Sequence, residues 1–209
     1  MRKYTPLLSI VLLLSVSFLY SIYYGISHSN NKQYTGLKYV ESSRRIPIGD
    51  EMLMTDEKEF ENYEKEYKKL LSQKFTLNQI KAIEEIIISN SSEFDTGDGE
   101  STIGLCYTTH HNSGKSVSTI LIASKNHRHL RTLLHECCHA LYFDNRKLFD
   151  SKYKDRWESL DYQFVSNYAT TNIKEDFAET GAAYLSGEEY GKECVEKIKL
   201  FKEFYNETR

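Results

Sequence analysis

The sequence predicts an α+β domain that is mainly helical and has one small sheet, preceded by an N-terminal signal or membrane-anchor segment. Apolar residues recur with helical spacing over several segments, two β-like runs flank a turn, and a long uncharged stretch lies near the N-terminus. Of the 209 residues, 40% are hydrophobic and 27% charged, which is enough to bury the core of one domain. The formal net charge of -3 gives no support for a nucleic-acid partner.

The uncharged stretch divides the chain into three expected parts. Residues 1–29 include a mostly apolar run, 7–26, and are expected to form either a cleaved signal peptide or an uncleaved signal-anchor. The run is longer than the apolar region of most signal peptides, which favours the anchor and a membrane contact through residues 7–26. Residues 30–50 are polar and are expected to be a tether, and residues 51–209 form the folded domain. Either outcome places this domain outside the cytoplasm, secreted or membrane-anchored.

Spacing and capping signals predict two helices at the start of the domain. Thr55 is expected to cap a helix whose apolar stripe ends at Leu71. Thr76 and Gln79 form a capping-box pattern for a second helix. The buried face of this second helix would contain Ile80, Ile83, Ile86 and Ile87. The acidic segment 91–101 lacks the spacing of a calcium loop and is expected to be a solvated loop.

The second half of the domain is expected to begin with two strands and to continue with helices. The strands are predicted at about 102–109 and 116–123. The helices are predicted at about 126–143, 152–164 and 172–187, with a last amphipathic helix from about 194. The cysteines are too few for a disulfide scaffold, and buried thiols are expected instead. They are Cys106, Cys137, Cys138 and Cys194.

The helix predicted at 126–143 contains the most informative motif. His135 and His139 are four residues apart, so both rings lie on one helix face and can bind one metal ion. Glu136 lies about 100° further around the helix and can reach a water molecule beside that ion. This HExxH arrangement is typical of zinc metalloproteases, which keep three protein ligands and one open position. The sequence therefore predicts one zinc ion per chain and a protein or peptide substrate.

The third ligand is expected to be a carboxylate, because no histidine follows His139 in the sequence. The metzincin pattern is excluded, since Asn145 stands where that class has its third histidine. Glu175 and Glu179 are distinguished among the candidates, because they lie four residues apart on one helix face with apolar neighbours. One of them can bind the metal while the other accepts the N–H of a ligating histidine, as is common around zinc.

The segment from Tyr168 to Glu179 closely resembles the C-terminal stretch of the anthrax lethal factor catalytic domain. It also resembles the corresponding stretch of the secreted bacterial Pro-Pro endopeptidases. In these gluzincin metallopeptidases a tyrosine is followed by six residues and then by Glu-x-Phe-Ala-Glu. The step from Tyr168 to Glu175 is the same here. The resemblance extends over roughly residues 102–205, and it implies a zincin-like catalytic domain.

The resemblance also implies a role for each residue. Glu175 would be the third zinc ligand, Glu136 the general base, and Tyr168 the donor to the tetrahedral oxyanion. Glu179 would orient a ligating histidine. The run 116–123 would be the edge strand to which a peptide adds as an extra strand. No other cofactor is implied.

The sequence departs from the family inside the motif, where Cys137 and Cys138 replace the usual small or aromatic pair. In addition, no counterpart of a Pro-selecting surface loop can be assigned. Two other hypotheses remain: a catalytically silent zincin-like binding domain, and an intracellular regulatory relative such as the zincin-like titration factors. The intact set of ligands, base and tyrosine argues against the first, and the N-terminal apolar segment argues against the second.

Overall fold

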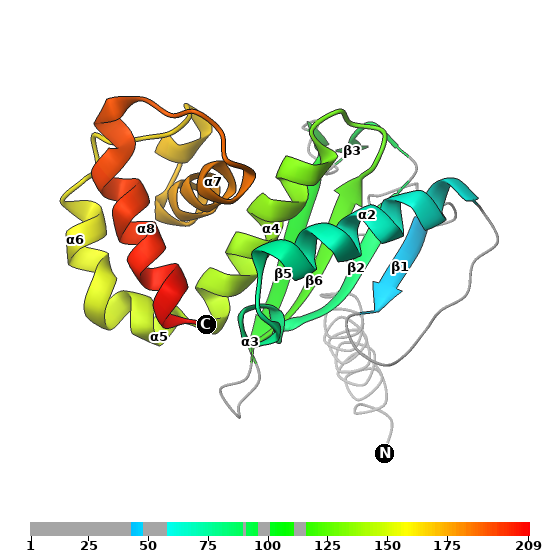
Figure 1. Cartoon of the computed structure of the whole chain (residues 1–209), viewed down its shortest axis with the longest axis horizontal. Coiled ribbons are helices and arrows are strands. Elements are labelled where there is room, and N and C mark those ends of the chain that lie inside the picture. Colours follow the sequence, from blue (N-terminus) through cyan, green and yellow to red (C-terminus); the bar gives the residue numbers. More distant parts are fainter. Residues whose placement is uncertain (1–42, 48–57, 90, 96–100, 111–115) are drawn as a thin grey trace, which may run out of the picture.

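Figure 1 shows the structure, a computed structural model that describes residues 43–47, 58–89, 91–95, 101–110 and 116–209. The expected signal or anchor segment lies outside these residues, as do most of the tether and the cap expected at Thr55. No helix in the described ranges is long and apolar enough to cross a membrane.

The described strands form a mixed four-stranded sheet with the order β1-β2-β6-β5 and a separate two-stranded ribbon. The central strands β2 and β6 run parallel, and β1 and β5 pair antiparallel with them at the two sides. The ribbon pairs β3 with β4, so the described residues form a second, two-stranded sheet in addition to the single sheet that was expected. The strands are β1 (Ser43–Pro47), β2 (Ile83–Ser89), β3 (Phe94–Asp95), β4 (Ser101–Thr102), β5 (Gly104–His110) and β6 (Ser116–Ala123).

The prediction of a second helix after Thr76 is wrong over most of the segment, which forms a strand. The capping box is present, because the Gln79 N–H donates to Thr76 Oγ1 at 3.4 Å and the Thr76 N–H donates to Gln79 Oε1 at 2.9 Å. However, α3 (Leu77–Ile80) is a single turn, and the following isoleucines belong to β2. These β-branched side chains are buried on both faces of a central strand, and that burial outweighs their helical spacing.

The two faces of the sheet have different covers, because side chains alternate along each strand. One face packs against α2 (Lys58–Lys74) and α4 (His129–Asp144), which both lie across the same side of the sheet in Figure 1. This cluster includes Tyr67, Leu71, Ile86, Ile88, Ile120, Ile122, Leu133 and Leu134. The other face packs against the ribbon through Phe94, Ile87 and Leu121. As a result α4 is fixed between the sheet and the remaining helices.

The remaining helices form the other side of the domain (Figure 1). They are α5 (Arg146–Leu148), a π-helical turn (Phe149–Tyr153), α6 (Lys154–Glu158), α7 (Ile173–Ser186) and α8 (Val195–Glu207). The helix predicted at 152–164 therefore starts earlier and ends at Glu158. Beyond this end the buried side chain of Gln163 accepts a hydrogen bond from the Lys197 N–H at 3.1 Å, which ties the segment to α8.

The prediction of a helix at 172–187 is confirmed by α7. The Asn172 side chain caps its first turn by accepting hydrogen bonds from the backbone of Lys174 and Glu175. Gly187 ends the helix in the left-handed conformation with φ of 76°. Aromatic residues anchor α7 against α8 and the π-helical turn, and they are Phe149, Trp157, Phe177, Phe201 and Phe204. This packing holds the N-terminal end of α7 against α4.

Candidate metal centre

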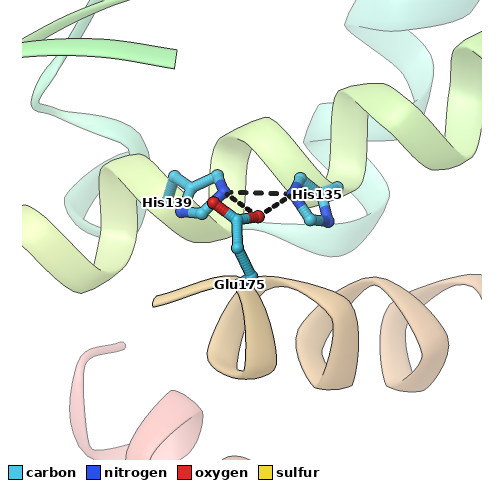
Figure 2. Close-up of side chains that lie close together, drawn as sticks. All are labelled: His135, His139 and Glu175. Carbon is cyan, nitrogen blue, oxygen red and sulfur yellow. Dashed lines mark hydrogen bonds and ion pairs between the residues drawn. The ribbon is translucent and has the colours of Figure 1, made fainter. Parts of the chain in front are cut away.

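The facing sides of α4 and α7 bring the predicted ligands together (Figure 2). Nε2 of His135 lies 3.0 Å from Nε2 of His139. Oε2 of Glu175 lies 3.2 Å from the first nitrogen and 3.1 Å from the second. The three atoms form a nearly equilateral triangle, with two corners from one helix and one from the other.

The size of this triangle fits a zinc ion. Tetrahedral zinc with bonds of about 2.0–2.1 Å requires ligand atoms about 3.3 Å apart. The separations of 3.0, 3.1 and 3.2 Å are a few tenths of an ångström shorter. One metal ion can be held by a group of histidine, cysteine, aspartate or glutamate side chains whose ligand atoms lie close together. Among the residues that the structure describes, His135, His139 and Glu175 form such a group.

The charges around the triangle also favour a cation. Nδ1 of His135 lies 2.8 Å from Oε1 of Glu179, so the ring proton is best placed on Nδ1. Nε2 of His135 then has a lone pair that faces the His139 ring and the Glu175 carboxylate. These acceptor atoms need a positive charge among them: in the metal-free site a proton on His135 supplies it, and a bound metal ion would replace that proton.

The pKa values of the metal-free site reflect the same negative field. Burial lowers the pKa of His135, but its hydrogen bonds with Glu175 and Glu179 outweigh burial and raise it to about 9. Burial raises the pKa of Glu175, but hydrogen bonds with both histidines outweigh burial and lower it to about 2. Glu175 is therefore ionised at neutral pH, as a metal ligand must be.

Glu136 lies next to the ligands but is directed towards β5. Burial raises the pKa of its carboxyl, although the neighbouring His135 and His139 act in the opposite direction. The carboxylate accepts a hydrogen bond from the backbone of Cys106 in β5. Gly104 leaves room for it, because a Cβ at this position would lie 2.7 Å from Glu136 Oε1. The strand thus seats Glu136 beside the triangle and apart from the ligand set.

Tyr168 lies beside His135, in a 3-10 turn (Tyr168–Thr170) just before α7. Its ring centroid is 6.0 Å from that of His135, and 57% of the residue is exposed. Burial and the negative charges of Glu175 and Glu136 raise the pKa of its phenol to about 12. The hydroxyl therefore keeps its proton at neutral pH and is able to donate it to a bound group.

Glu179 is held by two side chains that the sequence did not single out. Both of its oxygens accept hydrogen bonds from Arg131, at 2.9 and 3.0 Å, and one also accepts from Ser166 Oγ at 2.7 Å. Arg131 precedes His135 by four residues, so the helical period that selected the histidine pair also places it on their face. Ser166 carries no such signal, because its contact depends on how the 159–167 segment folds back.

The edge-strand prediction is wrong. The run 116–123 is β6, which pairs with β2 on one side and with β5 on the other. In the sheet that the structure describes, β5 forms the edge beside α4. Strand order depends on tertiary pairing, so the alternating pattern of β6 did not distinguish an edge from a centre.

The prediction of buried thiols holds for Cys137, Cys138 and Cys194, whereas Cys106 is half-buried, and all four cysteines are free. Cys137 and Cys138 are completely buried. Cys138 packs against α7, because a Cβ added at Gly181 would lie 2.5 Å from its sulfur. The two cysteines inside the motif are thus part of the core and lie outside the triangle of His135, His139 and Glu175.

Comparisons with models of protein families, with curated proteins and with solved structures found no match for this chain. At the site itself two imidazoles and one carboxylate meet beside a separate buried glutamate.

Proposed function

We propose that this protein is a zinc-dependent endopeptidase that acts outside the cytoplasm by the mechanism of the lethal factor and Pro-Pro endopeptidase group. The observation that carries the proposal is the triangle of His135, His139 and Glu175 ligand atoms, 3.0–3.2 Å apart, beside a buried Glu136 that is not part of it. Zinc hydrolases need this division, in which three groups bind the metal and a fourth handles protons.

Each residue has a defined task in peptide hydrolysis. Zinc held by the triangle would supply a Lewis acid that activates water and polarises the peptide carbonyl. Glu136 accepts a proton from the attacking water and passes it to the leaving amine. Tyr168 donates its hydroxyl proton in a hydrogen bond to the carbonyl oxygen as negative charge develops there. Glu179 holds the His135 ring so that Nε2 faces the metal position.

The open side of β5 supports a peptide substrate. The Ala123 N–H donates to the Ile103 carbonyl, and β5 pairs Gly104 with Ile122. Because bonding alternates along antiparallel strands, Cys106 and Thr108 direct their backbone groups away from β6. The Cys106 backbone contacts Glu136, so this edge runs beside the proposed base. Because the Cys106 N–H already donates to Glu136, an extended peptide would pair with β5 through the outward groups of Thr108, and its backbone would lie next to Glu136.

The test compares the purified full-length chain with its Glu136→Gln variant. We expect about one zinc per chain in both proteins by metal analysis. Cleavage of a diverse peptide library should occur only with the wild type and should stop with a chelator. Loss of the base should lower the cleavage rate about 10²–10⁴-fold. Wild-type cleavage by Glu136→Gln would overturn the mechanism, and iron in place of zinc would overturn the metal assignment.

The same experiment separates the alternatives. Zinc binding without cleavage of any library peptide would favour a silent binding domain over an enzyme. Cell fractionation tests the expected location, since a regulatory relative that acts inside the cell would be found in the cytoplasmic fraction.

A further inference from the structure

The carboxylate of Glu179 joins three segments behind the metal centre. Oε1 accepts a hydrogen bond from Arg131 Nη1 at 2.9 Å and lies 2.8 Å from His135 Nδ1. Oε2 accepts from Arg131 Nη2 at 3.0 Å and from Ser166 Oγ at 2.7 Å. The Glu179 side chain is only 7% exposed, so water has little access to replace these donors.

Arg131 restrains this carboxylate more than a single hydrogen bond would. A planar guanidinium that binds both oxygens of a carboxylate fixes its plane as well as its position. Arg131 is itself held, because its Nε donates to the two oxygens of Glu188 at 2.9 and 3.1 Å. Glu188 follows Gly187, whose left-handed conformation turns the chain back at the end of α7. Arg131 therefore lies between two carboxylates of α7 and its C-terminal turn.

Ser166 connects the same carboxylate to the segment of Tyr168. Its hydroxyl donates to Glu179 and accepts the N–H of Ala169 at 3.1 Å. Ala169 is buried in the 3-10 turn and is the residue after Tyr168. A change in the position of Glu179 would thus be transmitted to the ligand His135 on one side and to the Tyr168 turn on the other.

We propose that Arg131 is a positioning residue for the metal ligand His135 and that Ser166 is a positioning residue for Tyr168, with the Glu179 carboxylate as their shared anchor. This inference rests on the proposed function. Without Arg131 the carboxylate keeps only the Ser166 hydroxyl as a hydrogen-bond donor on Oε2, and Oε1 is no longer fixed beside Nδ1 of His135. Without Ser166 the carboxylate keeps its arginine clamp but loses one donor, and the tyrosine turn loses the acceptor of the Ala169 N–H.

The first test measures zinc affinity, by competition with a chromophoric chelator, for the full-length wild type, Arg131→Met and Arg131→Lys. Loss of a group that orients a zinc ligand typically weakens zinc binding 10–100-fold. We expect an increase in Kd of about this size for Arg131→Met. Arg131→Lys should also increase Kd, because an ammonium cannot bind both oxygens in one plane. The increase should be smaller than for Arg131→Met, because lysine keeps the positive charge. Arg156→Met is the matched control, since Arg156 forms an exposed ion pair with Glu203.

A wild-type Kd in folded Arg131→Met would overturn the Arg131 assignment. Should Arg131→Met not fold, as judged by circular dichroism, Arg131→Lys decides the question, and a wild-type Kd in that variant overturns it. An equal increase in the Arg156→Met control would also overturn it, because the effect would then not be specific to the anchor.

The second test is a double-mutant cycle of Ser166→Ala with Tyr168→Phe. Misplacement of a reacting group by about 1 Å costs up to about 10²-fold in rate, so Ser166→Ala should lower kcat about 10–100-fold. Its zinc Kd should change less than that of Arg131→Met. In the Tyr168→Phe background, Ser166→Ala should cause no further loss, because the hydroxyl it positions is absent. Ser159→Ala, which removes an exposed hydroxyl bonded to the Arg156 carbonyl, is the control.

An unchanged kcat in Ser166→Ala, or an equal loss in both backgrounds, would overturn the Ser166 assignment. Failure of the proposed function gives a different result. If the wild type binds zinc but cleaves no peptide, both the proposed peptidase function and the Ser166 assignment are contradicted. The comparison of zinc Kd values still tests the Arg131 assignment in that case. If the wild type cleaves peptides but Arg131→Met has an unchanged zinc Kd, only the Arg131 assignment is contradicted.

Discussion

Two neighbouring acids on α7, Glu175 and Asp176, have different surroundings. Glu175 faces α4, where its Oε2 lies 3.1–3.2 Å from the Nε2 atoms of two histidines. Asp176 faces the core, where its Oδ2 accepts hydrogen bonds from Lys197 Nζ at 2.7 Å and from Trp157 Nε1 at 2.8 Å. The side chain of Lys197 is 0% exposed and that of Asp176 is 5% exposed.

The comparison contrasts a buried ion pair within the core with the group of residues that we propose to bind a metal. At Asp176 the chain supplies its own cation, and the buried charges are neutralised by one another. At Glu175 the neighbours are two histidines, whose positive charge depends on a titratable ring proton that a metal ion can replace. Charged groups of this second kind are the ones that bind metals and substrates. The predictions below test whether the two groups are separable in this way.

Removal of a proposed ligand should have the largest effect. Glu175→Ala and His135→Ala should each lose stoichiometric zinc, because two ligands do not complete a tetrahedral site with one open position. Peptide cleavage should disappear with the metal. Metal analysis after gel filtration measures the zinc, and circular dichroism checks that the fold is kept. A variant that retains one zinc per chain would show that the ligand set is wrong.

Removal of the buried cation should affect stability instead. Lys197→Met leaves the Asp176 carboxylate without its partner in the core, and breaking a buried pair typically costs about 3–5 kcal/mol. Urea unfolding of the metal-free chain measures this difference. Lys199→Met is the control on the same helix, because Lys199 forms an exposed pair with Glu196. Equal stabilities of the two variants would contradict a structural role for the pair.

Tyr168→Phe tests the proposed site more finely. A lost donor to a developing oxyanion typically lowers kcat about 10²–10³-fold. KM should change little, provided it reflects substrate binding, since the contact forms only in the transition state. Zinc content and melting temperature should be unchanged, because an exposed phenol contributes little to packing. An unchanged kcat would remove Tyr168 from the proposed mechanism.

Gly104→Ala should have the smallest effect of the four. The added Cβ would lie 2.3 Å from Thr132 Cγ2 and 2.7 Å from Glu136 Oε1, so the Glu136 carboxylate must shift. We expect a lower kcat than in the wild type, a smaller loss than in Glu136→Gln, and unchanged zinc content. In Gly191→Ala, the control, the Cβ would meet the flexible end of exposed Glu193. Wild-type kcat in Gly104→Ala would show that the space at this glycine does not position the base.

Features that follow local rules could be predicted from the sequence. The shared face of His135 and His139 needs only the helical period, and Asn172 and Gly187 mark the ends of α7 by side-chain capping and a left-handed turn. The meeting of Glu175 with the histidines was predicted from spacing and resemblance, and the structure brings these residues together. Their zinc and catalytic roles stay predictions.

Features that depend on packing could not be predicted. The isoleucines of β2 have helical spacing, but pairing with β6 makes them a strand. Strand order made β5 rather than β6 the edge beside α4. Ser166 meets Glu179 only because the chain turns between α6 and α7. Each of these outcomes depends on contacts between residues far apart in the sequence, which no local pattern contains.

The buried thiol of Cys138 lies between α4 and α7, and its rate of chemical labelling can report on the opening of the core there. Burial raises the pKa of Cys137 and Cys138, so the reactive thiolate is scarce, and a labelling reagent must wait until the core opens. Cys138 packs against Gly181 of α7, so its labelling rate reports how often the two helices separate. A metal ion bound by histidines of α4 and Glu175 of α7 would tie these helices together and slow the reaction. The labelling rate of Cys138 would thus report whether the proposed centre holds a metal ion.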